Sequence, residues 1–277
     1  MIPAPFDYVR AATPDDALAA LGEHGDEAKL LAGGQSLLPL MKLRLAVPTV
    51  VVDLTGIDEL SYVRDEGDSL AIGALTRHHD VATNDVVRRE VPMLAHVAGL
   101  VGDPQVRHRG TVGGSVAHAD PSADLPTALL ALGASYVVRG QQGKRTVSAD
   151  DFSTGFLETV LEPDELLVEV QVPKAAAWGY EKFTRRAIDW ATVAAATVRR
   201  ADGSVAVALA NMGPTVLRAA AVEQAVASGS GAAEASALAD EGTEPGSDVT
   251  ASADYRRHLA RVLTSRALAA CLSGDRD

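Results

Sequence analysis

The chain has 277 residues, 47% of them hydrophobic, which is enough to bury one large core or two moderate ones. Its 37 acidic and 25 basic residues give a formal net charge of −12, which argues against a nucleic-acid or anionic-membrane surface. The single cysteine, Cys271, excludes an intrachain disulfide framework, and it excludes an iron–sulfur cluster or zinc ribbon built from this chain's own thiolates.

The sequence contains no apolar run of transmembrane length. Residues 1–5 do not have the pattern that begins a secretory signal. We therefore expect a cytoplasmic protein with no integral membrane segment and no nucleic-acid partner.

Helices and strands are mixed through the first 173 residues. Thr13 is a typical helix N-cap because Pro14 and two acidic residues follow it. Residues 49–54 are rich in valine, and residues 165–172 alternate between apolar and polar side chains, so both segments favour strands. The predicted helices begin at Thr13 or cover residues 36–43, 92–101 and 125–132, and the predicted strands cover residues 29–31, 49–54, 70–73, 135–138 and 165–172.

The pattern changes after Pro173, where we place a domain boundary near residue 174. Three strands are predicted over residues 180–185, 192–200 and 205–210, with a turn at residues 201–203 between the last two. The remaining segments are a helix over residues 217–227, a surface loop with a short helix over residues 228–252, and a final amphipathic helix over residues 255–272.

Two glycine pairs about 80 residues apart are the most informative motifs. Gly33-Gly34 follows a predicted strand, and Gly113-Gly114 lies in the second motif, which runs from Gly110 to Pro126. Glycine permits positive φ and close approach of the backbone to a ligand. Successive N–H groups in such turns form an anion-binding concavity. Two such motifs in one domain suit a ligand with two phosphates, such as a dinucleotide.

Several other kinds of site are disfavoured. Histidines and acids occur near the second motif, but the adjacent His78 and His79 cannot point the same way on a helix, and the sequence has no His-x-x-x-His pair. We therefore expect no metal site. A nucleophile elbow, a P-loop lysine motif and a Rossmann Gly-x-Gly-x-x-Gly motif are all absent from the sequence.

With these motifs, the chain resembles the FAD-binding medium subunit of molybdenum hydroxylases, the carbon monoxide dehydrogenase and xanthine dehydrogenase group. The resemblance covers nearly the whole chain, and the order and spacing of its motifs make it specific. The matching segments are residues 32–37, 53–54, 72–76, 110–126, 164–167, 180–183 and 189–191.

The resemblance implies an α+β fold. Residues 1–55 and 56–173 would form the two lobes of an FAD-binding domain of the vanillyl-alcohol-oxidase type, with FAD between them. Residues 174–277 would form a C-terminal domain with a three-stranded antiparallel sheet packed on helices.

The resemblance also implies which residues bind FAD noncovalently. Asp124 matches a carboxylate that bonds FAD, Ile72 an apolar contact of the isoalloxazine, Lys182 a basic residue near the flavin, and Trp190 an aromatic ring on the flavin's other face. Leu167 is also placed among the binding residues. The two pyrophosphate loops would comprise Leu31, Ala32, Gly33, Gly34, Gln35, Ser36 and Leu37, and Thr111, Val112, Gly113, Gly114 and Ser115.

Most of these residues also have an ordinary structural interpretation. A lone glycine pair is more often a tight turn, although the second matching motif reverses that balance. Asp124 alone is more often a helix N-cap, a role that can coexist with cofactor binding. Lys182 alone would be a solvated strand residue, and Trp190 a core or interface residue.

The function implied by the resemblance is electron transfer. Substrate would be hydroxylated on a large molybdopterin-binding subunit, and electrons would pass through two [2Fe–2S] centres on a small subunit to FAD on this chain, then to an external acceptor. No catalytic residue is assigned to this chain, and a dimer of heterotrimers is the expected assembly. The substrate pocket would lie on another chain.

Two alternatives remain. One is a stand-alone FAD-dependent oxidoreductase of the same fold, which would need its own catalytic acid and a substrate lobe that residues 174–277 do not obviously supply. The other is a scaffold with a vestigial flavin site, which the intact glycine pairs, Ser36, Ser115 and Asp124 disfavour.

Overall fold

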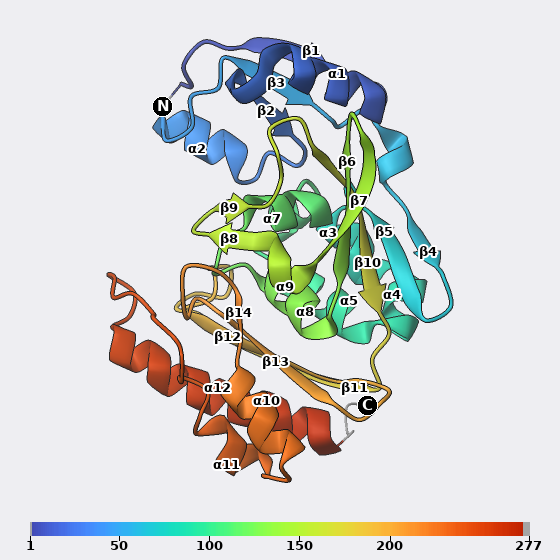
Figure 1. Ribbon diagram of the computed structural model, residues 1–277. Helices are drawn as coiled ribbons and strands as arrows, with labels where there is room; N and C mark the ends of the chain where they lie inside the picture. Colours follow the sequence, from blue (N-terminus) through green and yellow to red (C-terminus); the bar gives the residue numbers. More distant parts are fainter. Residues whose placement is uncertain (1, 274–277) are drawn as a thin grey trace.

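The computed structural model describes residues 2–273. Within these residues, three sheets follow one another along the chain, from the N-terminal sheet at the top of Figure 1 to the C-terminal sheet at the bottom. A short hairpin of β8 (Ser153–Gly155) and β9 (Glu158–Thr159) projects beside the middle part. None of the helices in this part of the chain combines the length and apolar character needed to cross a bilayer.

The N-terminal sheet is parallel, with β3 (Val50–Asp53) between β1 (Asp7–Arg10) and β2 (Ala28–Leu31). All four residues of β3 are buried, as its run of valines predicts. Thr13 caps the first helix in a capping box with Asp16, which confirms the predicted helix start. The helical segments of this part are α1 (Pro14–His24), η1 (Gly25–Glu27) and α2 (Leu37–Leu43).

The middle sheet is antiparallel and has the order β4-β5-β10-β6-β7. Its central strand shows the predicted alternation only from Val168 onward, because the register shifts at a β-bulge between Leu167 and Glu169. Leu166 and Val168 therefore pack toward the N-terminal sheet, whereas Val170 and Val172 pack into a core shared with the helices. The sheet therefore separates two cores. Its strands are β4 (Val63–Asp65), β5 (Ser69–Gly73), β6 (Ser135–Gly140), β7 (Gly143–Ser148) and β10 (Leu166–Pro173).

Short helices surround this middle sheet, and α8 is the most deeply buried of them, since all nine of its residues are buried. It packs between the middle part and the C-terminal sheet. The helical segments are η2 (Asp58–Leu60), α3 (His78–Thr83), α4 (Asp85–Glu90), α5 (Pro92–Leu100), α6 (Pro104–Arg107), α7 (Val112–His118), α8 (Asp124–Leu132) and α9 (Ala149–Phe152).

The C-terminal sheet is antiparallel, with the order β11-β12-β13-β14. The three predicted strands are present as β11 (Ala177–Phe183), β12 (Val193–Arg199) and β13 (Val205–Ala210). A fourth, two-residue strand, β14 (Leu217–Arg218), extends the sheet. The predicted helix over residues 217–227 therefore starts later, as α10 (Ala220–Ala227), because residues 217 and 218 pair with β13.

Alternating residues of the C-terminal sheet face two sides. Ala194 and Ala196 of β12 join the core around α8, whereas Val193 and Ala195 pack with the C-terminal helices α11 (Ala232–Ser236) and α12 (Ala253–Ser273). Helix α12 lies close against the sheet, as Figure 1 shows. A Cβ at Gly179 would lie 2.1 Å from the Ala267 carbonyl oxygen, so only glycine permits this approach.

Candidate functional site

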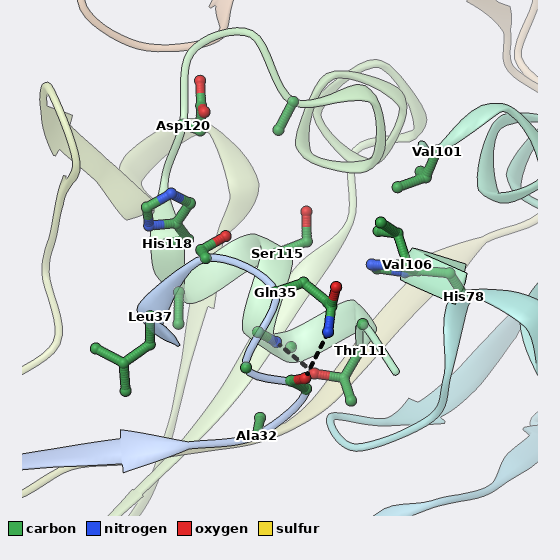
Figure 2. A pocket seen from close by; sticks show the side chains of 18 of the residues that line it. Ala32, Gln35, Leu37, His78, Val101, Val106, Thr111, Ser115, His118 and Asp120 are labelled. Atoms are coloured by element: carbon green, nitrogen blue, oxygen red, sulfur yellow. Dashed lines mark hydrogen bonds between the residues drawn. The ribbon is translucent and has the colours of Figure 1, made fainter. Parts of the chain in front are cut away.

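A cavity of about 560 Å³, within the range typical of cofactor sites, is lined by residues of β2 and β10, the short helices and the loop between β11 and β12. Figure 2 shows Gln35 and Ser115 near its centre, with His78 and Val106 on one side and His118 and Leu37 on the other. The predicted binding residues that line it are Ala32, Gly33, Gly34, Gln35, Ser36, Leu37, Thr111, Gly113, Gly114, Ser115, Asp124, Leu167 and Trp190.

The first glycine loop joins β2 to α2 and lines the cavity. Gly34 has φ 73°, in the left-handed region that favours glycine. The side chain of Ser36 makes no capping bond to α2. Within the part of the chain that the structure describes, the amides of four consecutive residues donate no hydrogen bond: Gly33, Gly34, Gln35 and Ser36. Such a row of N–H groups is suited to an anion.

The second glycine motif has a different structure, because Thr111 caps α7 and the glycines lie inside the helix. The predicted amide nest is wrong here: all four amides from Val112 to Ser115 donate within the chain. Their acceptors are Thr76 O (3.0 Å), Ala74 O (2.8 Å), Thr111 Oγ1 (3.1 Å) and Thr111 O (3.0 Å), in that order. This motif therefore presents the Thr111 and Ser115 side chains to the cavity instead of free amides.

The glycines allow the walls of the cavity to approach closely. A Cβ at Gly33 would lie 2.3 Å from the Arg109 carbonyl oxygen, so the first loop packs directly on the residues that precede the second. A Cβ at Gly113 would lie 2.5 Å from Ala74 Cβ. Neither Gly113 nor Gly114 has a positive φ, so close packing is what requires glycine at Gly113.

Asp124 connects the cavity to the C-terminal sheet. It is the first residue of α8 and is 7% exposed. Tyr180 Oη donates to its Oδ1 (2.6 Å), and Lys182 Nζ donates to its Oδ2 (2.8 Å). Burial raises the pKa of the Asp124 carboxyl, and the charge of Lys182 opposes that shift.

Four predicted binding residues do not line the cavity. Lys182 does not line the cavity itself, and its ammonium pairs with the Asp124 carboxylate, which does. Ile72 is fully buried in the core under the helices, whereas Ala74 and Leu75, which follow it in the chain, line the cavity. The remaining two are Leu31, at the end of β2, and Val112, which is fully buried.

The prediction for Trp190 has more support. Its side chain lines the cavity and is 66% exposed, so it lies at the rim and is not a core residue. It belongs to the loop between β11 and β12, together with Ile188 and Asp189.

His78 lines the cavity, although sequence reasoning considered it only as a metal ligand. It is 5% exposed, its Nδ1 is buried without a hydrogen-bond partner, and burial, with Arg77 and Arg107, lowers its pKa to about 4. The imidazole is therefore neutral near pH 7. Its position at the start of α3, directly after Arg77, gave no local signal of this burial. Within residues 2–273, no group of three or more His, Cys, Asp or Glu residues is placed to hold a metal ion.

Comparison with known families covers nearly the whole chain. Residues 4–175 match the family described as the FAD binding domain in molybdopterin dehydrogenase, and residues 178–271 match the CO dehydrogenase flavoprotein C-terminal domain. The chain is 42% identical over 285 residues to the carbon monoxide dehydrogenase medium chain of Hydrogenophaga pseudoflava, covering 97% of each. It is 36% identical over 277 residues to the glyceraldehyde dehydrogenase medium chain of Sulfolobus acidocaldarius, covering 96% of this chain and 98% of the relative.

Solved structures agree. Carbon monoxide dehydrogenase from Hydrogenophaga pseudoflava contains a chain that matches with a TM-score of 0.94 and 41% identity, with full coverage of both chains. A chain of quinoline 2-oxidoreductase from Pseudomonas putida 86 matches with a TM-score of 0.92 and 35% identity over 99% of each.

The fold and the cavity define a flavin-binding subunit of an oxidoreductase. More particularly, the chain belongs to the FAD-binding medium subunits of the molybdenum hydroxylase family. The resemblance inferred from the sequence is confirmed, as is the α+β fold with an FAD-binding domain followed by a C-terminal domain.

Proposed function

We propose that this chain transfers electrons within a molybdenum hydroxylase, from [2Fe–2S] clusters on a small partner subunit, through noncovalently bound FAD, to an external acceptor. Hydroxylation belongs to a large molybdopterin-binding partner, and two copies of each subunit form the complex in the cytoplasm. The observation that carries the proposal is the row of four free amides at residues 33–36, which borders a cavity large enough for a cofactor.

The residues around the cavity fit FAD. We propose that the free amides of the first loop bind the pyrophosphate, assisted by the Thr111 and Ser115 hydroxyls on the facing wall. Leu75 and Leu167 offer apolar surface to a ring system, and Trp190 covers it from the rim. Bound FAD would supply the exchange of one or two electrons, which no side chain of this protein provides.

Asp124 and Lys182 set the charge beside this cavity. Their ion pair is shielded from solvent, with side-chain exposures of 7% and 9%. The ammonium and the Tyr180 hydroxyl each donate to one oxygen of the carboxylate, and each oxygen keeps a lone pair that can accept from a bound cofactor. This arrangement supports a role for Asp124 in positioning the cofactor.

We also propose that three segments of the chain each supply a different part of the FAD site. Residues 1–55 supply the amide loop, residues 56–173 supply the facing wall, and residues 174–277 supply the rim and the partners of Asp124.

The test is native mass spectrometry of the protein purified from its own source, combined with a visible spectrum. We expect a complex with a large and a small partner, and both flavin and iron–sulfur bands. Acid precipitation should release the flavin into the supernatant. A monomer that carries FAD and oxidises a small substrate by itself would refute the electron-transfer assignment and support the alternative.

A further inference from the structure

The loop between β11 and β12, residues 184–192, places Ile188, Asp189 and Trp190 at the rim of the cavity. The side chains of Ile188 and Trp190 are 58% and 66% exposed, so burial alone does not hold them in place. The position of Trp190 therefore depends on what holds the ends of this loop.

The C-terminal end of the loop is held through two backbone carbonyls. Asn211 Nδ2 donates to Ala191 O (2.9 Å) and Thr192 O (3.2 Å), and Arg256 Nη1 donates to Thr192 O (2.7 Å). Both carbonyls come directly after Trp190 in the chain. Rotation of that backbone would move the indole, so these three bonds restrict it.

Asn211 ties the loop to the other wall of the cavity. It has φ 61°, a left-handed conformation that asparagine tolerates better than most residues. The backbone N–H of Asn211 donates to Pro121 O (2.7 Å), in the turn that leads to Asp124. The rim loop and the start of α8 are thus fixed to the same residue.

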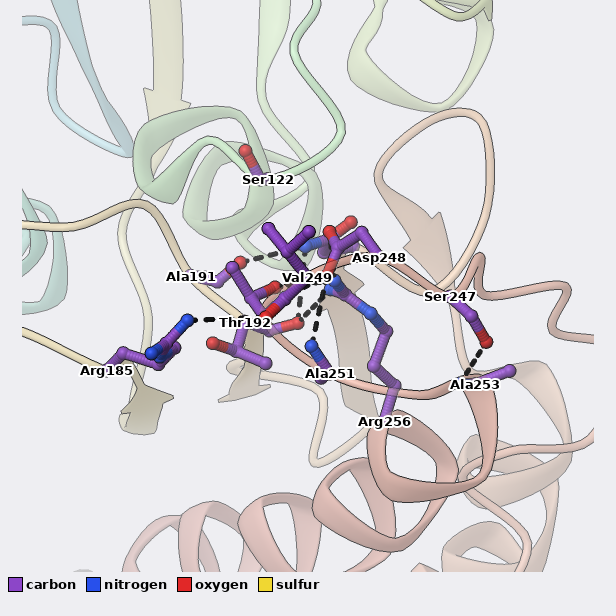
Figure 3. Close-up of polar contacts among 12 residues, drawn as sticks. Ser122, Arg185, Ala191, Thr192, Ser247, Asp248, Val249, Ala251, Ala253 and Arg256 are labelled. Atoms are coloured by element: carbon purple, nitrogen blue, oxygen red, sulfur yellow. Dashed lines mark hydrogen bonds and ion pairs between the residues drawn. The ribbon is translucent and has the colours of Figure 1, made fainter.

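Arg256 ties the loop to a second segment, residues 247–251. Its side chain is buried, although it carries a charge. Its Nη2 donates to Asp248 Oδ2 (2.7 Å), as Figure 3 shows, and to Thr250 Oγ1 (3.1 Å). Arg185, at the other end of the rim loop, donates to Val249 O (3.3 Å). One guanidinium fork therefore holds two loops together, which a lysine ammonium cannot reproduce.

We propose that Asn211 and Arg256 are positioning residues that hold Trp190 at the rim of the cavity and thereby set the access of small acceptors to the flavin. The inference rests on the proposed function, because it takes FAD as the occupant of the cavity. It assigns to the C-terminal domain a role in flavin reactivity that neither residue could have by contact, since neither lines the cavity.

The test uses the full chain with Trp178→Phe, which leaves Trp190 as its only tryptophan. Two variants loosen the anchor, Asn211→Gly and Arg256→Lys. Glycine tolerates the positive φ of residue 211, and the substitution removes only the side-chain amide of Asn211. The matched control is Arg261→Lys, since Arg261 lies on the same helix but pairs with Asp240 (2.6 Å), away from the loop.

Time-resolved anisotropy of Trp190 is measured with and without FAD, together with the rate at which dioxygen oxidises the reduced flavin. In both anchor variants we expect the amplitude of nanosecond motion to rise about two-fold and oxidation to become faster, with the FAD Kd within about three-fold of the parent value. The control should match the parent chain in all three measurements.

Unchanged anisotropy in a folded Asn211→Gly chain would overturn the proposal, as would an equal change in the Arg261→Lys control. If Arg256→Lys does not fold, Asn211→Gly alone decides. A parent chain that fails to bind FAD would refute the proposed function instead, and the FAD-free anisotropy would still test the anchor.

Discussion

The two glycine motifs have similar sequences and different structures. The first is an irregular loop in which Gly34 adopts a left-handed conformation and four amides have no partner among the residues that the structure describes. The second is the first turn of a helix, where Thr111 serves as N-cap and the amides are all satisfied. The residue two positions before each pair explains part of the difference: Thr111 can cap a helix, whereas Leu31 cannot. One motif therefore supplies donors, and the other supplies a rigid wall.

The two motifs also depend on each other, because the first packs on the backbone just before the second at Arg109 and Gly110. The comparison predicts that changes in the first loop affect FAD binding most strongly, whereas changes in the second mainly affect stability.

The largest effect is expected for Gly33→Val. The new Cβ would lie 2.3 Å from a backbone oxygen, which cannot move without separating the two motifs. We expect FAD binding to be lost and the free energy of unfolding to fall by about 3 kcal/mol, the upper end for overpacking. Calorimetric titration and urea unfolding measure both. Gly99→Val is the control, because no atom lies within 4 Å of a Cβ there. Normal FAD affinity in Gly33→Val would contradict the packing of the two motifs.

His78, which lines the cavity, should make the free energy of unfolding depend on pH. The pKa of His78 is about 4 in the folded chain and about 6.5 when unfolded, so the unfolded state binds more protons between these values. The neutral His78 side chain makes its full contribution to the free energy of unfolding above about pH 6.5. This contribution is lost as the pH falls toward 4, and the total loss is about 3 kcal/mol. Urea unfolding between pH 8 and pH 4 measures it.

His78→Gln should flatten this part of the pH profile, because glutamine does not titrate in this range. If His78→Gln keeps the slope, the source of the pH dependence lies elsewhere.

A smaller change is expected for Gly34→Ala. A left-handed alanine costs about 1–2 kcal/mol, and reorientation of the adjacent amides should weaken FAD binding about ten-fold or more. Gly67→Ala is the control for the positive φ, because Gly67 also has one (88°), does not line the cavity and has no atom within 4 Å of a Cβ. The control should lose the stability that a left-handed alanine costs and no FAD affinity. An equal loss of FAD affinity in both variants would show that the amide loop does not bind FAD.

The smallest effect on FAD is expected for Thr111→Val. It removes the hydroxyl that accepts from the Gly114 amide (3.1 Å), which should cost about 1 kcal/mol of stability. Asn84→Ala removes the N-cap of α4 and serves as the control for loss of a cap. FAD affinity should fall less in Thr111→Val than in Gly34→Ala. The reverse order would make the second motif the main cofactor site.

Local signals in the sequence predicted the elements whose character does not depend on distant contacts. The valines of β3, the alternation of β10 and the cap at Thr13 are examples. Strand β7 was not predicted, because most of its residues are exposed and show no apolar alternation. The start of α10 also differed, since only pairing with β13 shows that residues 217 and 218 form a strand.

The site could be predicted to the level of its loops but not to the level of each side chain. Ile72 lies only two residues before Ala74, which lines the cavity, yet the packing of β5 against the helices directs the Ile72 side chain into the core. Lys182 has its partner 58 residues away in the chain, so no local pattern shows the ion pair with Asp124. The burial of His78 likewise depends on tertiary packing.

The most direct test of the account is the amide NMR spectrum of the FAD-free chain during titration with FAD. Because an N–H group that binds a phosphate shifts downfield, we predict large downfield shifts for Gly33, Gly34, Gln35 and Ser36. The amides from Val112 to Ser115 should shift little, since they are already bonded within the chain. Large downfield shifts at residues 112–115, with none at residues 33–36, would contradict the central claim that the first loop binds the pyrophosphate.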